Sequence, residues 1–160
     1  MPSGVRVQIP PSAPFYASFV TDVYRAPMRS RRDDIDPRLA VERALELGLC
    51  GMGTTDDVRA ERRLERFTAA PEGTYVWTRG PNGFHLGRLT GPCRRDDSVA
   101  AVAADLVHVR PCEWIDEPVD AALVPEQVSY AFSRGGRNLQ RIGTLGAGEA
   151  TRHTWDSLAA

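Results

Sequence analysis

Lysine is absent from the chain of 160 residues, so all 20 of its basic residues are arginine. A genome rich in G and C explains this bias through its codon usage. The functional explanation is that forked guanidinium groups are needed for bidentate contacts. Composition alone does not separate the two. The net charge of −1 excludes bulk attraction to nucleic acid or to an anionic membrane as the main binding force.

Cysteine is scarce, and long apolar runs are missing. The three cysteines, Cys50, Cys93 and Cys112, are widely spaced, which excludes a disulfide framework and a Cys-x-x-Cys zinc site. No segment is apolar and long enough to span a bilayer, and the N-terminus lacks the apolar core of a secretory signal. We therefore expect a cytoplasmic protein with free thiols, without a cofactor and without a metal.

Residues 1–27 show neither helical nor strand periodicity. The stretch from Gly4 to Pro14 resembles the conceptual translation of the 3′ end of a transfer-RNA gene, whose stem and loop its codons would encode. We predict a disordered extension or a misassigned translation start, with the native start nearer Met28. The alternative is a genuine proline-rich disordered tail. The expected folded domain then covers residues 28–143.

Two helices are expected before the strands begin. Asp36-Pro37 is a helix-start signal, and the spacing of apolar residues predicts a helix over Pro37–Leu47 that ends at Gly48. Capping residues then open a second helix over Asp56–Ala69, with a weak apolar stripe of Val58, Arg62, Leu64 and Phe67. Further helical segments are predicted over 99–104 and 124–132.

Alternating β-prone residues predict the strands. Thr74–Arg79 and Phe84–Thr90 form a hairpin around a glycine-rich turn, and Asp105–Ile115 is the third clear strand. Leu49–Gly53 is a buried strand or a close-packed turn, and Asn138–Ile142 is a last short strand. Residues 144–160 are expected to form a loosely ordered tail tethered by Trp155 and Leu158. The fold class is therefore α+β, with a small β-barrel near residues 74–142.

The strand Asp105–Ile115 carries an unusual mixture of side chains on one face: His108, Arg110, Cys112 and Trp114. An apolar core face would not carry His and Arg, and a solvent face would not usually end in Trp. An aromatic plane provides a stacking platform, and Arg110 could contact a base edge or a phosphate. The alternative is a strand edge where Trp114 caps a core and Arg110 pairs with Glu113 or Asp116.

Other aromatic residues lie on the hairpin that is expected to pair near this strand. Trp77 and either Phe84 or His85 could join Trp114 to wall a pocket for a planar or methylated group. The alternative is that a small domain uses these large side chains to fill its core.

A glycine-hinged run of donors spans residues 134–141 and includes Arg137, Gln140 and Arg141. The two adjacent glycines would let backbone amides approach a ligand. The Lys-Ser/Thr of a phosphate-binding loop is missing, and a solvated loop is the other interpretation.

Catalysis has little support in the sequence. Cys112 and His108 share a face but are too far apart for direct proton transfer, so a nucleophile pair would need His85 or His153. A zinc site built from Cys93, Cys112, His85 and His108 lacks every usual spacing. We therefore assign no catalytic residue.

Two motifs support a resemblance to a known family. The segments GRLTG (87–91) and HVRPCEW (108–114) resemble a domain found with modification-dependent restriction endonucleases and phage-defence proteins. That domain is similar to the PUA and EVE barrels, which hold a flipped or modified base in a pocket. The resemblance covers residues 37–142. The tyrosine common after the Thr-Gly turn is replaced by Cys93-Arg94-Arg95, and no nuclease or ATPase motif is present.

These observations and the resemblance predict a non-catalytic module, associated with restriction and defence, that recognises a nucleobase, with or without modification, in DNA or RNA. A nuclease or another effector protein would act as its partner. The expected ligand-binding residues are Trp77, Phe84, Arg88, His108, Arg110, Trp114, Arg137, Gln140 and Arg141. The main alternative is a protein–protein adaptor with the tryptophans as hot spots. The third is a small hydrolase using Cys112 or a serine.

Overall fold

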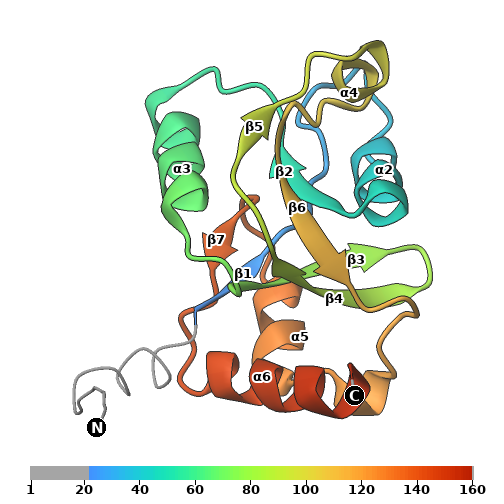
Figure 1. The fold of residues 1–160 in the computed structure, drawn as a ribbon, viewed down its shortest axis with the longest axis vertical. Coiled ribbons are helices and arrows are strands. Elements are labelled where there is room, and N and C mark those ends of the chain that lie inside the picture. Colours follow the sequence, from blue (N-terminus) through green and yellow to red (C-terminus); the bar gives the residue numbers. More distant parts are fainter. Residues whose placement is uncertain (1–21, 160) are drawn as a thin grey trace, which may run out of the picture.

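A computed structural model describes residues 22–159, and a seven-stranded mixed sheet lies at its centre (Figure 1). The strands are β1 (Val23–Arg25), β2 (Leu49–Met52), β3 (Tyr75–Gly80), β4 (Gly83–Leu89), β5 (Arg94–Arg95), β6 (His108–Trp114) and β7 (Gln140–Arg141). The helices are α2 (Leu39–Leu47), α3 (Val58–Ala69), α4 (Val99–Ala104), α5 (Glu126–Ser133) and α6 (Ala147–Leu158), with a 3-10 turn at Ala121–Leu123.

The strand order is β2-β6-β4-β3-β1-β7, and β5 pairs with β6. β1 pairs in parallel with β3, and the other pairs are antiparallel. Within residues 22–159 no pairing joins the end strands β2 and β7, so the sheet curls into a half-barrel and does not close. The predicted α+β class is confirmed, whereas the closed barrel of the PUA and EVE type is not shown.

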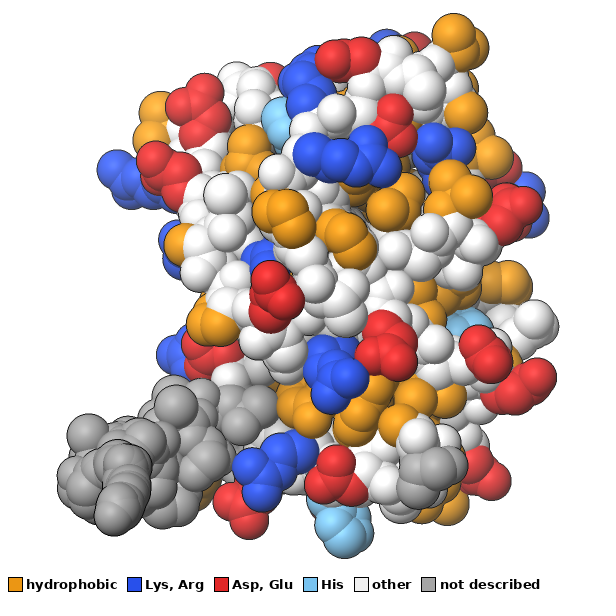
Figure 2. Space-filling view, in the orientation of Figure 1, with side chains coloured by type: hydrophobic (Ala, Val, Ile, Leu, Met, Phe, Trp, Pro, Cys, Tyr) orange, Lys and Arg blue, Asp and Glu red, His pale blue; other side chains and the backbone are white. Residues whose placement is uncertain are grey.

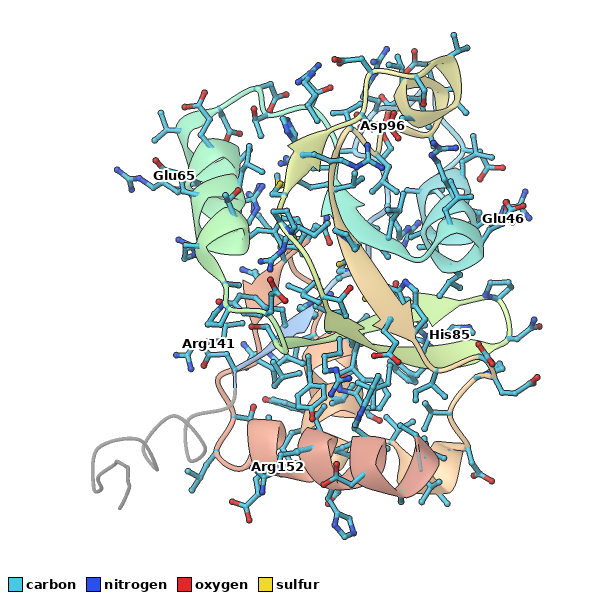
Figure 3. All side chains as sticks on the ribbon, in the orientation of Figure 1. Glu46, Glu65, His85, Asp96, Arg141 and Arg152 are labelled. Atoms are coloured by element: carbon cyan, nitrogen blue, oxygen red, sulfur yellow. The ribbon has the colours of Figure 1, made fainter. Side chains whose placement is uncertain are left out.

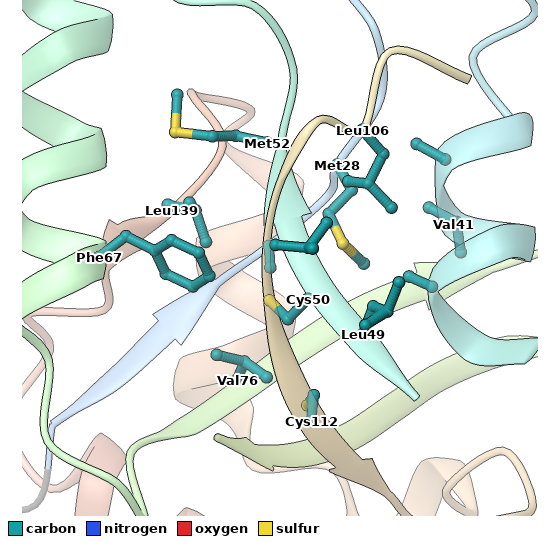
Figure 4. Close-up of a cluster of buried hydrophobic side chains, with 14 of the residues drawn as sticks. Met28, Val41, Leu49, Cys50, Met52, Phe67, Val76, Leu106, Cys112 and Leu139 are labelled. Atoms are coloured by element: carbon teal, nitrogen blue, oxygen red, sulfur yellow. The ribbon is translucent and has the colours of Figure 1, made fainter. Parts of the chain in front are cut away.

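The central part of the sheet separates two apolar clusters. Val76 of β3 packs with residues of α2, α3, β2 and β6 in the first cluster, which Figure 4 shows from within. Its neighbours Tyr75 and Trp77 point to the other face and pack with residues of α5 and α6. Because successive side chains of a strand alternate between faces, one short strand contributes to both cores.

The local sequence signals account for several elements. Gly48 ends α2 in the left-handed conformation with φ 69°, and its N–H donates to the carbonyl of Ala44. Asp57 caps α3 by accepting from the N–H of Ala60 at 2.7 Å. The predicted helices over 37–47 and 56–69, the hairpin and the strand over 105–115 are confirmed within a few residues at their ends.

The prediction of a loosely ordered tail is wrong, because α6 occupies residues 147–158. Its buried face consists of Ala147, Thr151, Thr154 and Trp155, which recur at helical spacing. The ring of Trp155 lies 5.7 Å from that of Tyr75. Small residues and threonines line most of this face, so it lacks the pattern of large apolar side chains from which a helix is usually predicted.

The predicted boundary near Met28 is also wrong for residues 22–27. Val23–Arg25 form β1, which lies between β3 and β7 in the sheet. The remainder of the predicted extension, residues 1–21, lies outside the described residues. None of the helices within residues 22–159 is long and apolar enough to cross a membrane.

Candidate nucleic-acid interface

A cleft of about 1030 Å³ opens where five segments meet. Its walls come from the β1–α2 connection, the residues after β2, the inner side of α3, the tip of the β3–β4 hairpin and the α5–β7 loop. These segments are distant in sequence. We call this hollow the arginine cleft, because eight arginines line it: Arg25, Arg29, Arg31, Arg32, Arg38, Arg63, Arg79 and Arg137.

Positive charge exceeds negative charge in the arginine cleft. Among residues 22–159, Asp56 and Asp105 are the two carboxylates that line it. Arg32 and Arg38 form ion pairs with the neighbouring Asp34 and Asp36, at 3.0 and 2.9 Å. Six arginines therefore face two carboxylates in a chain whose net charge is −1. By contrast, Figure 2 shows acidic and basic side chains interspersed over the face that it displays.

Arg25 of β1 lies in the arginine cleft and contacts the end of α5 and the α5–β7 loop. Its Nη1 donates to the carbonyl of Ala131 at 2.7 Å and to that of Gly135, and its guanidinium lies 5.0 Å from the centre of the Phe132 ring. Burial lowers the pKa of Arg25. A Cβ on Gly136 would come within 2.8 Å of Arg25 Nη1, so the loop passes this side chain where only glycine fits.

Asp105 links two of the segments that line the cleft. Its carboxylate accepts from Ser30 Oγ at 2.7 Å and from the backbone N–H of Thr54 at 3.0 Å. It thereby ties the β1–α2 connection, which carries Arg29 and Arg31, to the end of β2. Asp105 has a φ of 55°, which is uncommon for a residue other than glycine.

Asn138 links the α5–β7 loop to two other segments by hydrogen bonds. Its Oδ1 accepts from the N–H of Met28 at 3.1 Å, and its Nδ2 donates to the carbonyl of Gly51 at 2.9 Å. Met28 and Leu139 both have a φ of 57°. Such backbone conformations are found preferentially at binding sites and active sites, where the surrounding contacts hold them in place.

The predicted aromatic pocket does not form. Trp77 is fully buried, and its Nε1 donates to Thr151 Oγ1 at 3.0 Å, which leaves no ring face for a ligand. Trp114 is half-buried, its Nε1 donates to the carbonyl of Leu49 at 2.9 Å, and its ring covers Gly87. Phe84 packs edge-on against Trp77 and Phe132. These aromatic side chains fill and cover the core, which was the alternative interpretation.

Arg110 is a structural residue. It is 2% exposed, and its guanidinium donates to the carbonyls of Gly91, Phe67 and Ala70 at 2.7 to 2.8 Å. The last two carbonyls belong to the end of α3, where helical hydrogen bonds run out. The side chain thus joins β6 to α3, and its prediction as a ligand contact is wrong.

The remaining predicted site residues are spread over the molecule. Arg88 pairs with Glu113 at 3.0 Å on the surface and stacks on Trp155, while His108 is half-buried, with a pKa lowered mainly by burial. Arg141 lies on β7, at the edge of the sheet, on the opposite side of the molecule from the labelled His85 of β4 (Figure 3).

Arg137 alone of the nine predicted residues lines the arginine cleft, and Gln140 supports its loop. The Oε1 of Gln140 accepts from the backbone N–H of Arg137 at 2.9 Å. The sequence signal for the other arginines was weak. Arg29, Arg31 and Arg32 crowd one connection, and Arg63 stands among other arginines of α3, but Arg25, Arg63 and Arg79 come from separate parts of the sequence and meet only through the fold.

The two buried thiols, Cys50 and Cys112, are unsuited to nucleophilic catalysis. Burial raises the pKa of Cys50 to about 12 and that of Cys112 well above its usual range. Both therefore remain in the thiol form near neutral pH, whereas the thiolate is the nucleophile. Within residues 22–159, no three His, Cys, Asp or Glu side chains gather in a way that could hold a metal ion.

Two solved structures share the fold. The YTH domain of Zygosaccharomyces rouxii MRB1, in complex with N6-methyladenosine RNA, aligns with a TM-score of 0.50 at 12% identity over 88% of this chain and 85% of that one. The MmI1 YTH domain aligns with a TM-score of 0.50 at 11% identity over 88% of this chain and 100% of that one. No family model matches this chain, and no curated protein matches it.

At these identities the comparison shows a common fold and leaves the ligand open. The likeness is one of fold: both of these structures are YTH domains, and one of them is in complex with N6-methyladenosine RNA. The association with restriction and phage defence is not shown by them.

Proposed function

We propose that this chain is a non-catalytic module that binds single-stranded RNA in the arginine cleft and holds one nucleotide, with or without a base modification. The observation that carries the proposal is the concentration of eight arginines on one hollow of a chain with a net charge of −1. Guanidinium forks bind phosphates bidentately and stack on bases. The fold shared with a YTH domain that holds RNA supports RNA over DNA.

The shape of the cleft favours a single-stranded ligand. Its volume of about 1030 Å³ is at the upper end of what small-molecule sites offer and is sufficient for one nucleotide. Apolar and polar groups share the lining: Pro27, Phe132 and Pro81 lie beside the arginines. A flexible single strand can place a base against such a wall and its phosphates against the charged groups.

Fluorescence anisotropy with short labelled oligoribonucleotides tests the proposal. One RNA carries a single N6-methyladenosine, a second has unmodified adenosine, and a DNA of the same sequence is the third ligand. We expect RNA binding whose affinity falls with salt, because phosphate contacts release counterions. The double variant Arg31→Gln, Arg79→Gln should weaken binding by about ten-fold or more.

The matched control removes the same charge elsewhere. Arg59 and Arg62 lie on the exposed side of α3 and do not line the cleft. R59Q/R62Q should bind RNA within about three-fold of the wild-type affinity. The proposal is wrong if no oligonucleotide binds at low salt, or if both double variants lose affinity equally.

The motif resemblance extends the proposal to phage defence, with cleavage supplied by a partner nuclease. Deletion of the gene should then raise the plating efficiency of phages with modified bases. Unchanged plating across such phages would contradict this role and leave RNA binding unaffected.

A further inference from the structure

The inner face of α3 carries an arginine where an apolar side chain is usual. Ala60, Arg63 and Phe67 are the buried residues of this helix, and their spacing of three and four places them on one face. Arg63 is only 6% exposed and is one of the residues that line the arginine cleft. The helix therefore directs a guanidinium, instead of a leucine-like side chain, toward the interior.

This guanidinium has no protein partner in the described part of the chain. Its buried Nε has no acceptor, and none of the hydrogen bonds or ion pairs formed within residues 22–159 involves Arg63. A buried donor without an acceptor costs free energy. An anion supplied from outside would provide the missing acceptors.

The surroundings of Arg63 add positive charge. Burial is the largest cause of its lowered pKa, and the charges of Arg137, Arg31 and Arg66 lower the pKa further. Asp57 opposes this effect, but its carboxylate accepts from the N–H of Ala60 as the cap of α3 and forms no ion pair with Arg63. The charge surplus is therefore local to this side of the cleft.

The loop that carries Arg137 is held in place before any ligand arrives. Gly135 and Gly136 have φ values of 72° and 136°, and the Arg137 N–H donates to the side chain of Gln140. The connection that carries Arg31 is tied down through Ser30 and Asp105. A backbone that is already held in place loses less entropy on binding than a mobile one.

We propose that Arg63, Arg31 and Arg137 form a phosphate subsite on the α3 side of the arginine cleft. A phosphate offers several acceptor oxygens and the negative charge that three guanidinium forks require, whereas one carboxylate has only two oxygens. Two sources share this chemistry. One is the backbone or terminal phosphate of an RNA, and in that case the subsite rests on the proposed function. The other is free phosphate.

Thermal unfolding of the full chain tests the subsite without nucleic acid. The melting temperature is followed by circular dichroism in increasing sodium phosphate, against sodium chloride of equal ionic strength. We expect phosphate to raise the melting temperature of the wild type beyond the effect of chloride, because a ligand that binds the native state stabilises it. Arg63→Met should unfold at a higher temperature than the wild type without phosphate and should lose the phosphate response.

Two further variants keep the result interpretable. Arg62→Met removes the neighbouring charge from the exposed side of the same helix and should respond to phosphate as the wild type does. Arg137→Gln changes a loop residue without entering the core and should halve the phosphate response or reduce it further. The subsite is ruled out if the wild type shows no phosphate response, or if R63M keeps it in full.

A pair of RNAs of one sequence, with a 5′-phosphate or a 5′-hydroxyl, distinguishes the sources. Tighter binding of the phosphorylated RNA identifies a terminal phosphate, and equal binding that R63M weakens about ten-fold identifies the backbone. Equal binding that R63M leaves unchanged shows that RNA does not use the subsite, which then belongs to free phosphate if R63M abolishes the thermal response and is overturned if it does not. A phosphate response without binding of any RNA overturns the proposed function while the subsite stands.

Discussion

Arg110 on β6 and Arg63 on α3 are both almost fully buried, and they reach this state in different ways. The guanidinium of Arg110 donates to three backbone carbonyls, two of which end α3. The guanidinium of Arg63, on the same helix that Arg110 holds, has no acceptor among residues 22–159. The Arg110 side chain therefore finds all its acceptors within the protein, whereas the buried Nε of Arg63 finds none, which is the observation on which the proposed subsite rests.

The difference shows that residue type does not separate structural from functional arginines. Both side chains are long, charged and buried, and what distinguishes them is whether acceptors from distant segments reach them. Gly91 and Ala70, which supply carbonyls to Arg110, are 19 and 40 residues away from it in sequence. This contrast can be tested from both sides.

The largest effect is expected from Arg110→Met. The change leaves buried carbonyls of Gly91, Phe67 and Ala70 without their donor, so the free energy of unfolding should fall by about 3 kcal/mol or more. Urea denaturation measures this. Arg94→Met, on the exposed strand β5, is the control and should stay within about 0.5 kcal/mol. If R110M were as stable as the control, the structural role assigned to Arg110 would be wrong.

Trp77→Phe should lower the free energy of unfolding by about 2 kcal/mol. The smaller ring leaves a cavity in the second apolar cluster, and Thr151 Oγ1 loses its donor. RNA affinity should remain within about two-fold of the wild type, because Trp77 does not line the cleft. A marked loss of affinity, with the fold intact, would restore Trp77 as a ligand contact.

Gly136→Ala tests the other side of the comparison. A Cβ there would lie 2.6 Å from Gln140 Oε1 and 2.8 Å from Arg25 Nη1, so we expect a loss of about 1–2 kcal/mol of stability and weaker RNA binding. At Gly135, also at positive φ, a Cβ would meet nothing within 4 Å. Gly135→Ala should therefore lose only the stability that a positive φ costs a residue with a Cβ, with no added steric clash. Identical RNA affinities of the two variants would contradict the proposed role of this loop.

The smallest effect is expected from pH. Burial lowers the pKa of His85, so below its ordinary value near 6.5 the unfolded chain binds a proton that the folded chain does not. The free energy of unfolding should therefore fall as pH decreases from 7.5 to 5.5. His108 acts in the same direction, and His85→Gln should reduce the slope. The arginines keep their charge over this range, so RNA binding should persist. A stability that rises with acidity would contradict the burial of these rings.

Local signals in the sequence were sufficient for much of the fold. The start of α2 near Asp36-Pro37, its end at Gly48, and the hairpin follow from capping and turn chemistry that acts within a few residues. α6 was missed because its buried face is built from Ala147, Thr151 and Thr154, whose burial depends on packing against distant strands. β1 was missed because it has only three residues, beside a proline-rich stretch, and three residues are too few to show an alternation of apolar and polar side chains.

The candidate site was largely beyond the reach of the sequence. Alternation along the strand that contains Arg110 correctly grouped its side chains on one face, but burial of that face depends on α3 and on the backbone near Gly91. The arginine cleft takes Arg25, Arg63 and Arg79 from three elements, and no local period relates them. Only the glycine-hinged loop with Arg137 could be identified from its own sequence.

The position of β1 has a practical consequence for any shortened version of the protein. A chain begun at Met28 would lack the strand that separates β3 from β7 and would also lose Arg25 from the cleft. The edge of β3 that normally pairs with β1 would be exposed, and the second apolar cluster would lack Val23. An exposed strand edge can pair with strands of other molecules. Such a truncation is expected to precipitate or to form disordered oligomers, so recombinant work should retain residues 22–27.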